Sequence, residues 1–235
     1  MHQKGFSAYT TGGYEVGSDE FVAALREKGW SVDHLANHQA TETFPNSVAE
    51  LAPYDVVILS DIGADTLLLH PDTFVRGERT PNRLGVVDEW VRSGGALLMV
   101  GGYMSFAGFE GKGRYHATPV EECLPVHIEG YDDRSERPEG VHPQVRDVDH
   151  PVLAGLGEPW PYFLGYNRIR AKEGADVLLA VEDDPFLVVG GRGDGRSAAF
   201  VSDCSPHWGS PDFMAWDGYA TFWDQLLGWL TKRDA

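Results

Sequence analysis

Two short apolar runs in the first half of the chain have the pattern of buried β-strands. Asp55–Ser60 reads DVVILS and Ala96–Val100 reads ALLMV, so hydrophobic residues occupy consecutive rather than alternate positions. Such runs are typical of strands that are covered on both faces in a parallel sheet. Between them, Arg83–Arg92 places its apolar residues on one face of a helix. This order of strand, helix and strand predicts right-handed crossover connections and a parallel sheet.

Helical periodicity also marks both ends of the chain. Ser18–Lys28 starts with a capping residue and two acids, and Gly29 follows as a stop. In Tyr219–Leu230 the large apolar residues fall at offsets 0, 3, 4, 7, 8 and 11, which is the spacing of one helical face. Shorter helices are expected at Pro45–Leu51 and at Thr118–Cys123, where a capping box with proline at the first helical position begins the second of them.

Other segments carry weaker signals. Trp30–Leu35 alternates well enough to predict a strand, whereas Gly130–Gln144 is polar and rich in Asp, Arg, Glu and Pro, so we expect an exposed excursion there. Late in the chain, short apolar runs separated by turn residues predict an antiparallel extension of the sheet. These strands are Asp176–Val181, Phe186–Val189 and Ser197–Val201, with a hairpin turn at Gly191–Gly195.

Together these elements predict a single α/β domain over residues 1–235, with a doubly wound, mostly parallel sheet and an antiparallel C-terminal extension. We find no internal repeat and no linker that divides the chain. Doubly wound domains usually begin with a strand, but this chain begins with a polar, Gly-rich loop that leads into a helix. We therefore expect either that a first strand is absent from the chain or that its place in the sheet is filled in another way.

Composition and charge exclude several classes of protein. The 235 residues are 42% hydrophobic and include 36 acids against 19 bases, which gives a net charge of −17. Such a field repels phosphate backbones and anionic lipid, so neither nucleic acid nor a membrane surface is expected as a partner. No apolar run approaches the ~18 residues of a membrane span, and no signal segment is recognisable. Two cysteines are too few for a disulfide framework, and we predict a cytoplasmic protein.

Candidate functional residues follow the predicted strands. Because ligands bind at the carboxyl ends of parallel strands, we expect Ser60–Asp65, Gly101–Phe106 and Ser202–Gly209 to meet at one edge of the sheet. Loop-like Gly165–Asn167 adds a further aromatic residue. The ligand-binding residues expected from these segments are Asp61, Ile62, Gly63, Gly101, Gly102, Tyr103, Tyr166, Asn167 and Trp208.

The three strand-end segments, SDIGA, GGYMSF and SDCSPHWG, together resemble the putative glutamine amidotransferase family. This family belongs to the class I glutamine amidotransferase-like superfamily of flavodoxin-like folds. The resemblance extends from His2–Gly5 to the helix that contains Trp229. It implies one further strand before His2–Gly5. It also implies a tight elbow after a strand, at which active relatives carry a nucleophilic cysteine between glycines.

This chain departs from the family pattern at that elbow. Gly102 is followed by Tyr103, and a phenol with a pKa near ~10 is a poor substitute for a thiolate. The His-x-Glu that activates the thiol is also absent, since the corresponding region reads DCSPH. We therefore expect no ordinary glutaminase activity. Trehalose-utilisation and β-galactosidase trimerisation domains are similar in fold, so by analogy the expected ligand is a small polar or carbohydrate-like metabolite.

An alternative enzyme hypothesis uses Cys204 and His207. Their Cys-x-x-His spacing on a loop could supply the nucleophile and base of a hydrolase acting on a C–N or ester bond, with Asp203 or Asp61 orienting the imidazole. Backbone amides near Gly63 or Gly102 would then act as oxyanion donors. The other interpretation is that Cys204 fills space in the core while the imidazole stacks on the neighbouring tryptophan.

Aromatic residues gather in the last third of the chain and have three interpretations: core packing, a ligand wall or a subunit interface. They are Trp160, Tyr162, Phe163, Tyr166, Trp208, Phe213, Trp216 and Tyr219. The third interpretation makes the protein an oligomer-building module, so a homo-oligomer is an expected assembly alongside the small-molecule ligand. The nine histidines form no His-Glu-x-x-His pattern, and we expect neither a metal site nor a cofactor.

Overall fold

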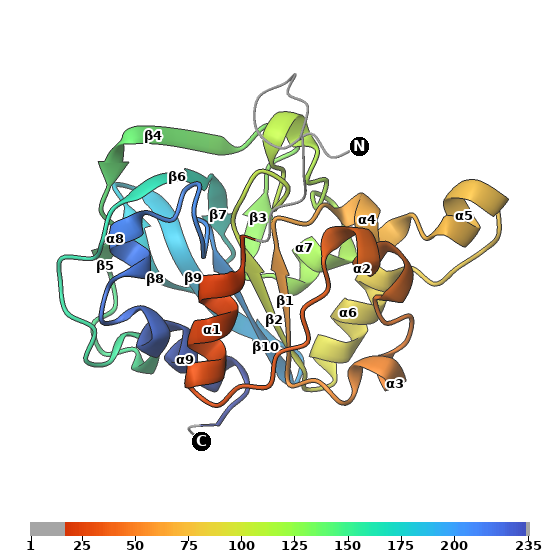
Figure 1. Cartoon of the computed structure of the whole chain (residues 1–235), viewed down its shortest axis with the longest axis horizontal. Helices are drawn as coiled ribbons and strands as arrows, with labels where there is room; N and C mark the ends of the chain where they lie inside the picture. The colour runs from red at the N-terminus through yellow and green to blue at the C-terminus, as the bar shows by residue number, and fades with distance from the viewer. Residues whose placement is uncertain (1–16, 234–235) are drawn as a thin grey trace.

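A mixed sheet of six strands lies at the centre of the computed structural model, which describes residues 17–233 (Figure 1). The strand order is β1-β2-β10-β9-β8-β5, with β1, β2 and β10 parallel and the remaining neighbours antiparallel. The strands are β1 (Val56–Ser60), β2 (Ala96–Val100), β5 (Gln144–Val145), β8 (Asp176–Val181), β9 (Asp184–Arg192) and β10 (Gly195–Phe200).

The parallel part of the sheet confirms the prediction from the apolar runs. Every residue of β2 is buried, because β1 and β10 flank its two edges and side chains pack on both faces. β10 joins the two halves of the sheet: it runs parallel to β2 and antiparallel to β9. The antiparallel extension beyond it is also confirmed, and the sheet as a whole is mixed, with two parallel pairs.

Nine α-helices lie around the sheet within residues 17–233 (Figure 1), and two of them, α6 and α9, pack directly on it. Helix α6 packs on β2 and β10 and against α3, α4 and α7. Helix α9 contacts β10 and packs against α1. The helices are α1 (Asp19–Glu27), α2 (Asn37–Thr43), α3 (Val48–Leu51), α4 (Ala64–Leu68), α5 (Pro71–Arg76), α6 (Arg83–Arg92), α7 (Pro119–Cys123), α8 (Pro211–Met214) and α9 (Tyr219–Leu230).

Helix boundaries follow the capping signals in the sequence. The Asn82 side chain accepts hydrogen bonds from the Leu84 and Gly85 amides and begins α6 at Arg83. Thr118 likewise caps α7 by accepting from the Glu121 amide. The periodic apolar face of α9 is buried along its length, as the offsets predict. In α1, by contrast, the predicted cap Ser18 makes no side-chain capping bond.

The strand predicted over Trp30–Leu35 is wrong, because this segment is irregular. Its alternating apolar side chains do not all turn inward: Trp30 is buried, whereas Leu35 is 39% exposed. The Trp30 indole donates instead to the carboxylate of Asp224 on α9, at 2.8 Å. This segment is therefore held by a side-chain hydrogen bond to a helix rather than by backbone pairing with a neighbouring strand.

The exposed excursion predicted over Gly130–Gln144 is also wrong in its central part. β4 (Arg134–Val141) pairs antiparallel with β6 (Phe163–Asn167) above the main sheet, and a second small pair joins β3 (Val126–Ile128) to β7 (Ile169–Ala171) (Figure 1). Asp133, directly before β4, and Ser135, within it, are buried. Strand β6 also contains Gly165–Asn167, which we expected to form a loop.

The resemblance at His2–Gly5 and the expected absence of a first strand concern the start of the chain, outside the described residues. No helix within residues 17–233 combines the length and apolar character needed to cross a membrane.

Candidate functional site

The loops that follow β1, β2 and β10 meet at the carboxyl edge of the parallel strands. The Asp61 carboxylate, after β1, accepts a hydrogen bond of 2.8 Å from the amide of Met104, after β2. Tyr103 lies on the same loop as Met104, and its ring centroid is 4.3 Å from that of His207, after β10. Parallel strands thus bring the three predicted segments together, because all three loops leave the sheet at the same edge.

The elbow after β2 depends on two glycines. A Cβ at Gly101 would lie 2.2 Å from the carbonyl oxygen of Val201, so the neighbouring backbone leaves no room for a side chain. Gly102 has φ +145°, a conformation that L-residues rarely adopt. Its amide donates to Oδ1 of Asn167 at 3.0 Å, and its carbonyl accepts from Nδ2 of Asn167 at 3.2 Å. Fully buried Asn167 therefore clamps the elbow, and the Gly102 amide is not free to act as an oxyanion donor.

A buried carboxylate supports the loop from below. Asp133 accepts hydrogen bonds from the amides of Ala107 and Gly108 at 2.9 and 2.8 Å, and from Nδ2 of Asn167 at 2.8 Å. Burial raises the pKa of Asp133 to about 6, although these three donors favour the ionised form. Asp133 thus links the start of β4 to the elbow.

The most exposed carboxylate of the site is oriented by two aromatic donors. The Tyr103 hydroxyl donates to Oε1 of Glu136 at 2.6 Å, and the indole Nε1–H of Trp208 donates to Oε2 at 3.0 Å. Half of the Glu136 side chain (47%) nevertheless faces solvent. Burial and the bond to Glu136 raise the pKa of Tyr103 to about 12, so the phenol remains protonated near neutral pH. Tyr103 therefore positions Glu136 and is not an activated nucleophile.

Arg134 lies beside this carboxylate but is already engaged. Its guanidinium carbon is 4.6 Å from the ring centroids of both Tyr103 and Phe109. Nε and Nη2 donate to the two carboxylate oxygens of Asp132 at 2.9 and 2.8 Å, a bidentate pairing. The charge of Arg134 is consequently neutralised locally, and its guanidinium is not an open clamp for an anionic ligand.

His207 is held in a strained conformation. Its φ is +132°, which is a genuine outlier for a residue with a side chain. Nδ1 lies 3.3 Å from Oδ2 of Asp203, and the imidazole stacks on Trp208 with 23° between the planes, as predicted. The side chain is 36% exposed. Backbone strain of this kind persists only where the surroundings enforce it, and it is common at functional sites.

Cys204 does not have the environment of a nucleophile. Its side chain is 1% exposed, and Sγ lies 3.7 Å from Oγ of Ser60. Burial raises the pKa of the thiol to about 12, so the thiolate is not populated at neutral pH. His207 contacts Asp203, Tyr103 and Trp208. The geometry therefore favours the interpretation of Cys204 as a core residue over the hydrolase alternative.

The remaining predicted ligand residues have structural contacts. The Ile62 carbonyl accepts from the Tyr115 hydroxyl at 2.7 Å, and Gly63 begins α4 with little space beside Met104. Tyr166 is fully buried and donates to Oδ2 of Asp184 at 2.7 Å, so no face of its ring is open to a ligand. Most of the late aromatic residues are likewise core residues: Trp160, Phe163, Tyr166, Trp208, Phe213 and Tyr219.

Sequence reasoning missed the residues that β4 contributes, namely Arg134, Glu136 and the preceding Asp133. Because this polar strand lacks alternating apolar residues, its composition is the same as that of a solvated loop. Within residues 17–233, no cluster of three His, Cys, Asp or Glu side chains has an arrangement that could hold a metal ion.

Two solved structures share both fold and sequence with this chain. Cytoplasmic protein STM3548 from Salmonella typhimurium is 42% identical, with a TM-score of 0.91 over 97% of this chain and 93% of that one. Cytoplasmic protein STM1381 from Salmonella typhimurium LT2 is 41% identical, with a TM-score of 0.90 and the same coverage.

More distant similarity is limited to the fold. A β-galactosidase from Rahnella sp. R3 is 16% identical, with a TM-score of 0.53 over 88% of this chain and 26% of the enzyme. Comparison with curated proteins gives no match. The model of the family described as "Putative glutamine amidotransferase" matches residues 1–232, and the chain belongs to that family.

Proposed function

We propose that this protein is a family member without ordinary glutaminase activity that binds a small, neutral, hydroxyl-rich ligand of the carbohydrate class. The proposed site is the strand-end cluster, formed by Tyr103, Arg134, Glu136, His207 and Trp208. The observation that carries the proposal is the Glu136 carboxylate, which two aromatic donors orient while 47% of the side chain stays open to solvent. The names of the two Salmonella relatives support a cytoplasmic location.

The exposed groups of the cluster favour hydroxyls as binding partners. A fixed carboxylate accepts hydrogen bonds from hydroxyl groups, and the partly exposed imidazole of His207 can donate to or accept from them. An anionic ligand is disfavoured because Asp132, Glu136 and Asp203 lie in the same region and the chain carries a net charge of −17. The guanidinium of Arg134 pairs with Asp132 and lies 3.6 Å from Oε1 of Glu136, so one cation is already shared between two of these carboxylates.

Three features argue against glutamine hydrolysis. The elbow residue is a phenol whose pKa is raised to about 12, and the thiol of Cys204 is sealed in the core with its pKa raised to a similar value. The Gly102 amide donates to Asn167 and is not available to stabilise an oxyanion.

The experiment is a thermal unfolding assay with glucose, galactose, mannose and trehalose. A sugar present at about ten times its dissociation constant stabilises the folded state by ~1.4 kcal/mol, a rise of roughly 3 °C in Tm. We expect at least one sugar to produce this rise in the wild type. The shift should be absent in Glu136→Gln, which keeps the shape of the side chain but loses its charge.

Glu139→Gln is the matched control, because Glu139 lies on the same strand and its side chain is 65% exposed. It should keep the sugar-induced shift. An equal shift in Glu136→Gln, or no shift with any of the four sugars, would contradict the proposed site. Release of ammonia from L-glutamine by the wild type, lost in Tyr103→Phe, would contradict the absence of glutaminase activity.

A further inference from the structure

Exposed apolar side chains concentrate around α5. Seven large hydrophobic side chains are exposed within residues 17–233, and three of them lie within residues 69–75: Leu69 (37%), Phe74 (72%) and Val75 (75%). Helix α5 projects from the body of the molecule, beyond α2 and α4 (Figure 1). Exposed apolar side chains that cluster in this way are typical of an interaction surface.

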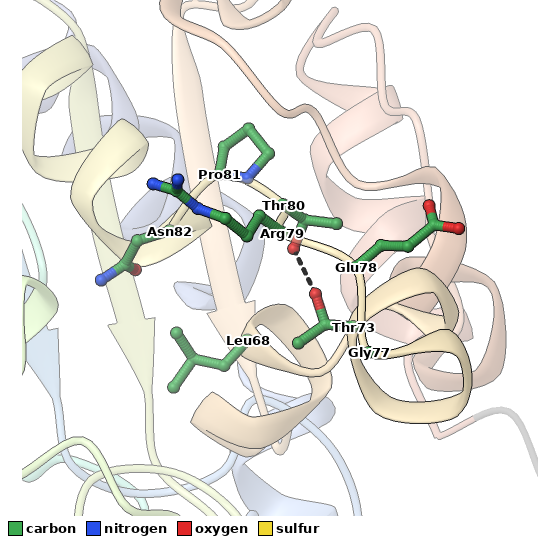
Figure 2. Close-up of a pocket in the computed structure, with 8 residues that line it drawn as sticks. All are labelled: Leu68, Thr73, Gly77, Glu78, Arg79, Thr80, Pro81 and Asn82. Atoms are coloured by element: carbon green, nitrogen blue, oxygen red, sulfur yellow. Dashed lines mark hydrogen bonds between the residues drawn. The ribbon is translucent and has the colours of Figure 1, made fainter.

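A hollow lies next to this helix, on a side that Phe74 does not line (Figure 2). Its volume is about 510 Å³, whereas a cavity of ~150 Å³ already accommodates benzene. Thr73 and Gly77, one turn apart on or just after α5, form one wall, and a hydrogen bond of 2.7 Å between Thr73 and Thr80 ties this wall to the next segment. The lining residues are Leu68, Thr73, Gly77, Glu78, Arg79, Thr80, Pro81 and Asn82.

The charge of this surface fits a second copy of the same chain. Residues 69–82 contain two acids, Asp72 and Glu78, and two bases, Arg76 and Arg79, so their formal charges sum to zero. The chain as a whole carries −17, which makes most of its surface repel another copy. A strongly basic partner would be attracted to the acidic surface elsewhere. Two copies of this chain, by contrast, can approach through the neutral α5 region without local repulsion.

We propose that α5 and the adjacent hollow form a two-fold contact between two copies of the chain, in which Phe74 of each copy enters the hollow of the other. A two-fold axis makes such a contact self-complementary, since each copy supplies both the inserted side chain and the receiving surface. The contact is separate from the strand-end cluster and does not rest on the proposed ligand.

The test is sedimentation equilibrium of the full chain over micromolar to submillimolar concentrations. We expect the wild type to dimerise and Phe74→Glu to raise the dimer dissociation constant at least ~30-fold, the effect of losing a central apolar anchor. Val148→Glu is the matched control: Val148 is 74% exposed, lies outside this surface and gains the same charge. This control should dimerise like the wild type.

A second variant tests the receiving side. Arg79→Glu changes the local charge from zero to −2 and should weaken the dimer most at low salt. Far-UV circular dichroism should be unchanged in Phe74→Glu, because its side chain is mostly exposed in one copy. A wild type that stays monomeric over the whole range overturns the proposal. So does Phe74→Glu that dimerises as tightly as the wild type, or Val148→Glu that dissociates equally.

Discussion

The imidazole of His207 lies edge-on to the phenol ring of Tyr103, with 4.3 Å between ring centroids and 79° between the planes. This contact joins the loop after β10 to the elbow after β2. The Tyr103 hydroxyl continues the connection to Glu136 on β4. The phenol that follows Gly102 therefore packs against His207 and orients Glu136.

His207 provides a direct test of backbone strain at this contact. Its φ of +132° is readily adopted by glycine and unfavourable for alanine. We expect His207→Gly to be more stable than His207→Ala by about 1–3 kcal/mol in urea unfolding. Where no strain exists the order is reversed, with alanine favoured by ~0.4–1 kcal/mol. Both variants lose the imidazole contacts, so the comparison isolates the backbone; His207→Ala at least as stable as His207→Gly would contradict the strain.

The two cysteines should be unreactive in the native protein. Burial raises the pKa values of both Cys123 and Cys204 to about 12, and their side chains are 2% and 1% exposed. Iodoacetamide at neutral pH should therefore label neither thiol until urea unfolds the chain, after which both react. Mass spectrometry after tryptic digestion distinguishes the two positions. Rapid labelling of native Cys204 would restore the hydrolase hypothesis that its burial now disfavours.

The central part of the fold could be predicted because the sequence patterns there were local and strong. The runs that became β1 and β2 are apolar at nearly every position, and α6 begins where Asn82 provides a cap. Convergence of Asp61, Tyr103 and His207 was also predictable, because strand topology alone places their loops at one edge.

The residues that complete the site could not be predicted in the same way. Glu136 lies in a strand whose apolar content is too low to reveal its period, and its pairing with β6 is a long-range contact. The burial of Tyr166 likewise depends on how β6 packs over the main sheet. Both outcomes are set by tertiary packing, which overrides local composition.

Arg83 is predicted to stabilise the fold although no carboxylate among residues 17–233 forms an ion pair with it. Its side chain is 1% exposed, and its guanidinium donates to carbonyl oxygens near the carboxyl ends of α2 and α4, including Leu67 at 2.6 Å and Thr41 at 2.8 Å. A cation at two helix C-termini is favourable, and it satisfies carbonyls that would otherwise be buried unpaired.

Arg83→Met should therefore lower the free energy of unfolding by about 3 kcal/mol or more, as measured by urea denaturation. Arg83→Lys should lie between this variant and the wild type, because an ammonium has fewer donors and cannot reach all the carbonyls. Arg92→Met is the control at an exposed arginine of the same helix and should change stability by less than ~1 kcal/mol. Equal effects at the two positions would show that the buried hydrogen bonds contribute little.

Asp133 should make stability depend on pH in the direction opposite to a salt-bridged acid. Burial raises its native pKa to about 6, above the ~3.9 of an unfolded chain, so the native state binds more protons between these pH values. The contribution of Asp133 to the free energy of unfolding is then greatest below pH ~4 and falls by about 3 kcal/mol as the pH rises through 6.

Asp133→Asn removes this titration while leaving the other groups in place. It also turns an amide donor toward the Ala107 or Gly108 amide, or toward Asn167, so the variant is less stable at every pH. The test is therefore how the difference in the free energy of unfolding between wild type and Asp133→Asn changes with pH. In urea unfolding, the advantage of the wild type should shrink between pH 4 and 6. A constant difference would mean that the three donors offset the cost of burial and hold the native pKa of Asp133 near its unfolded value.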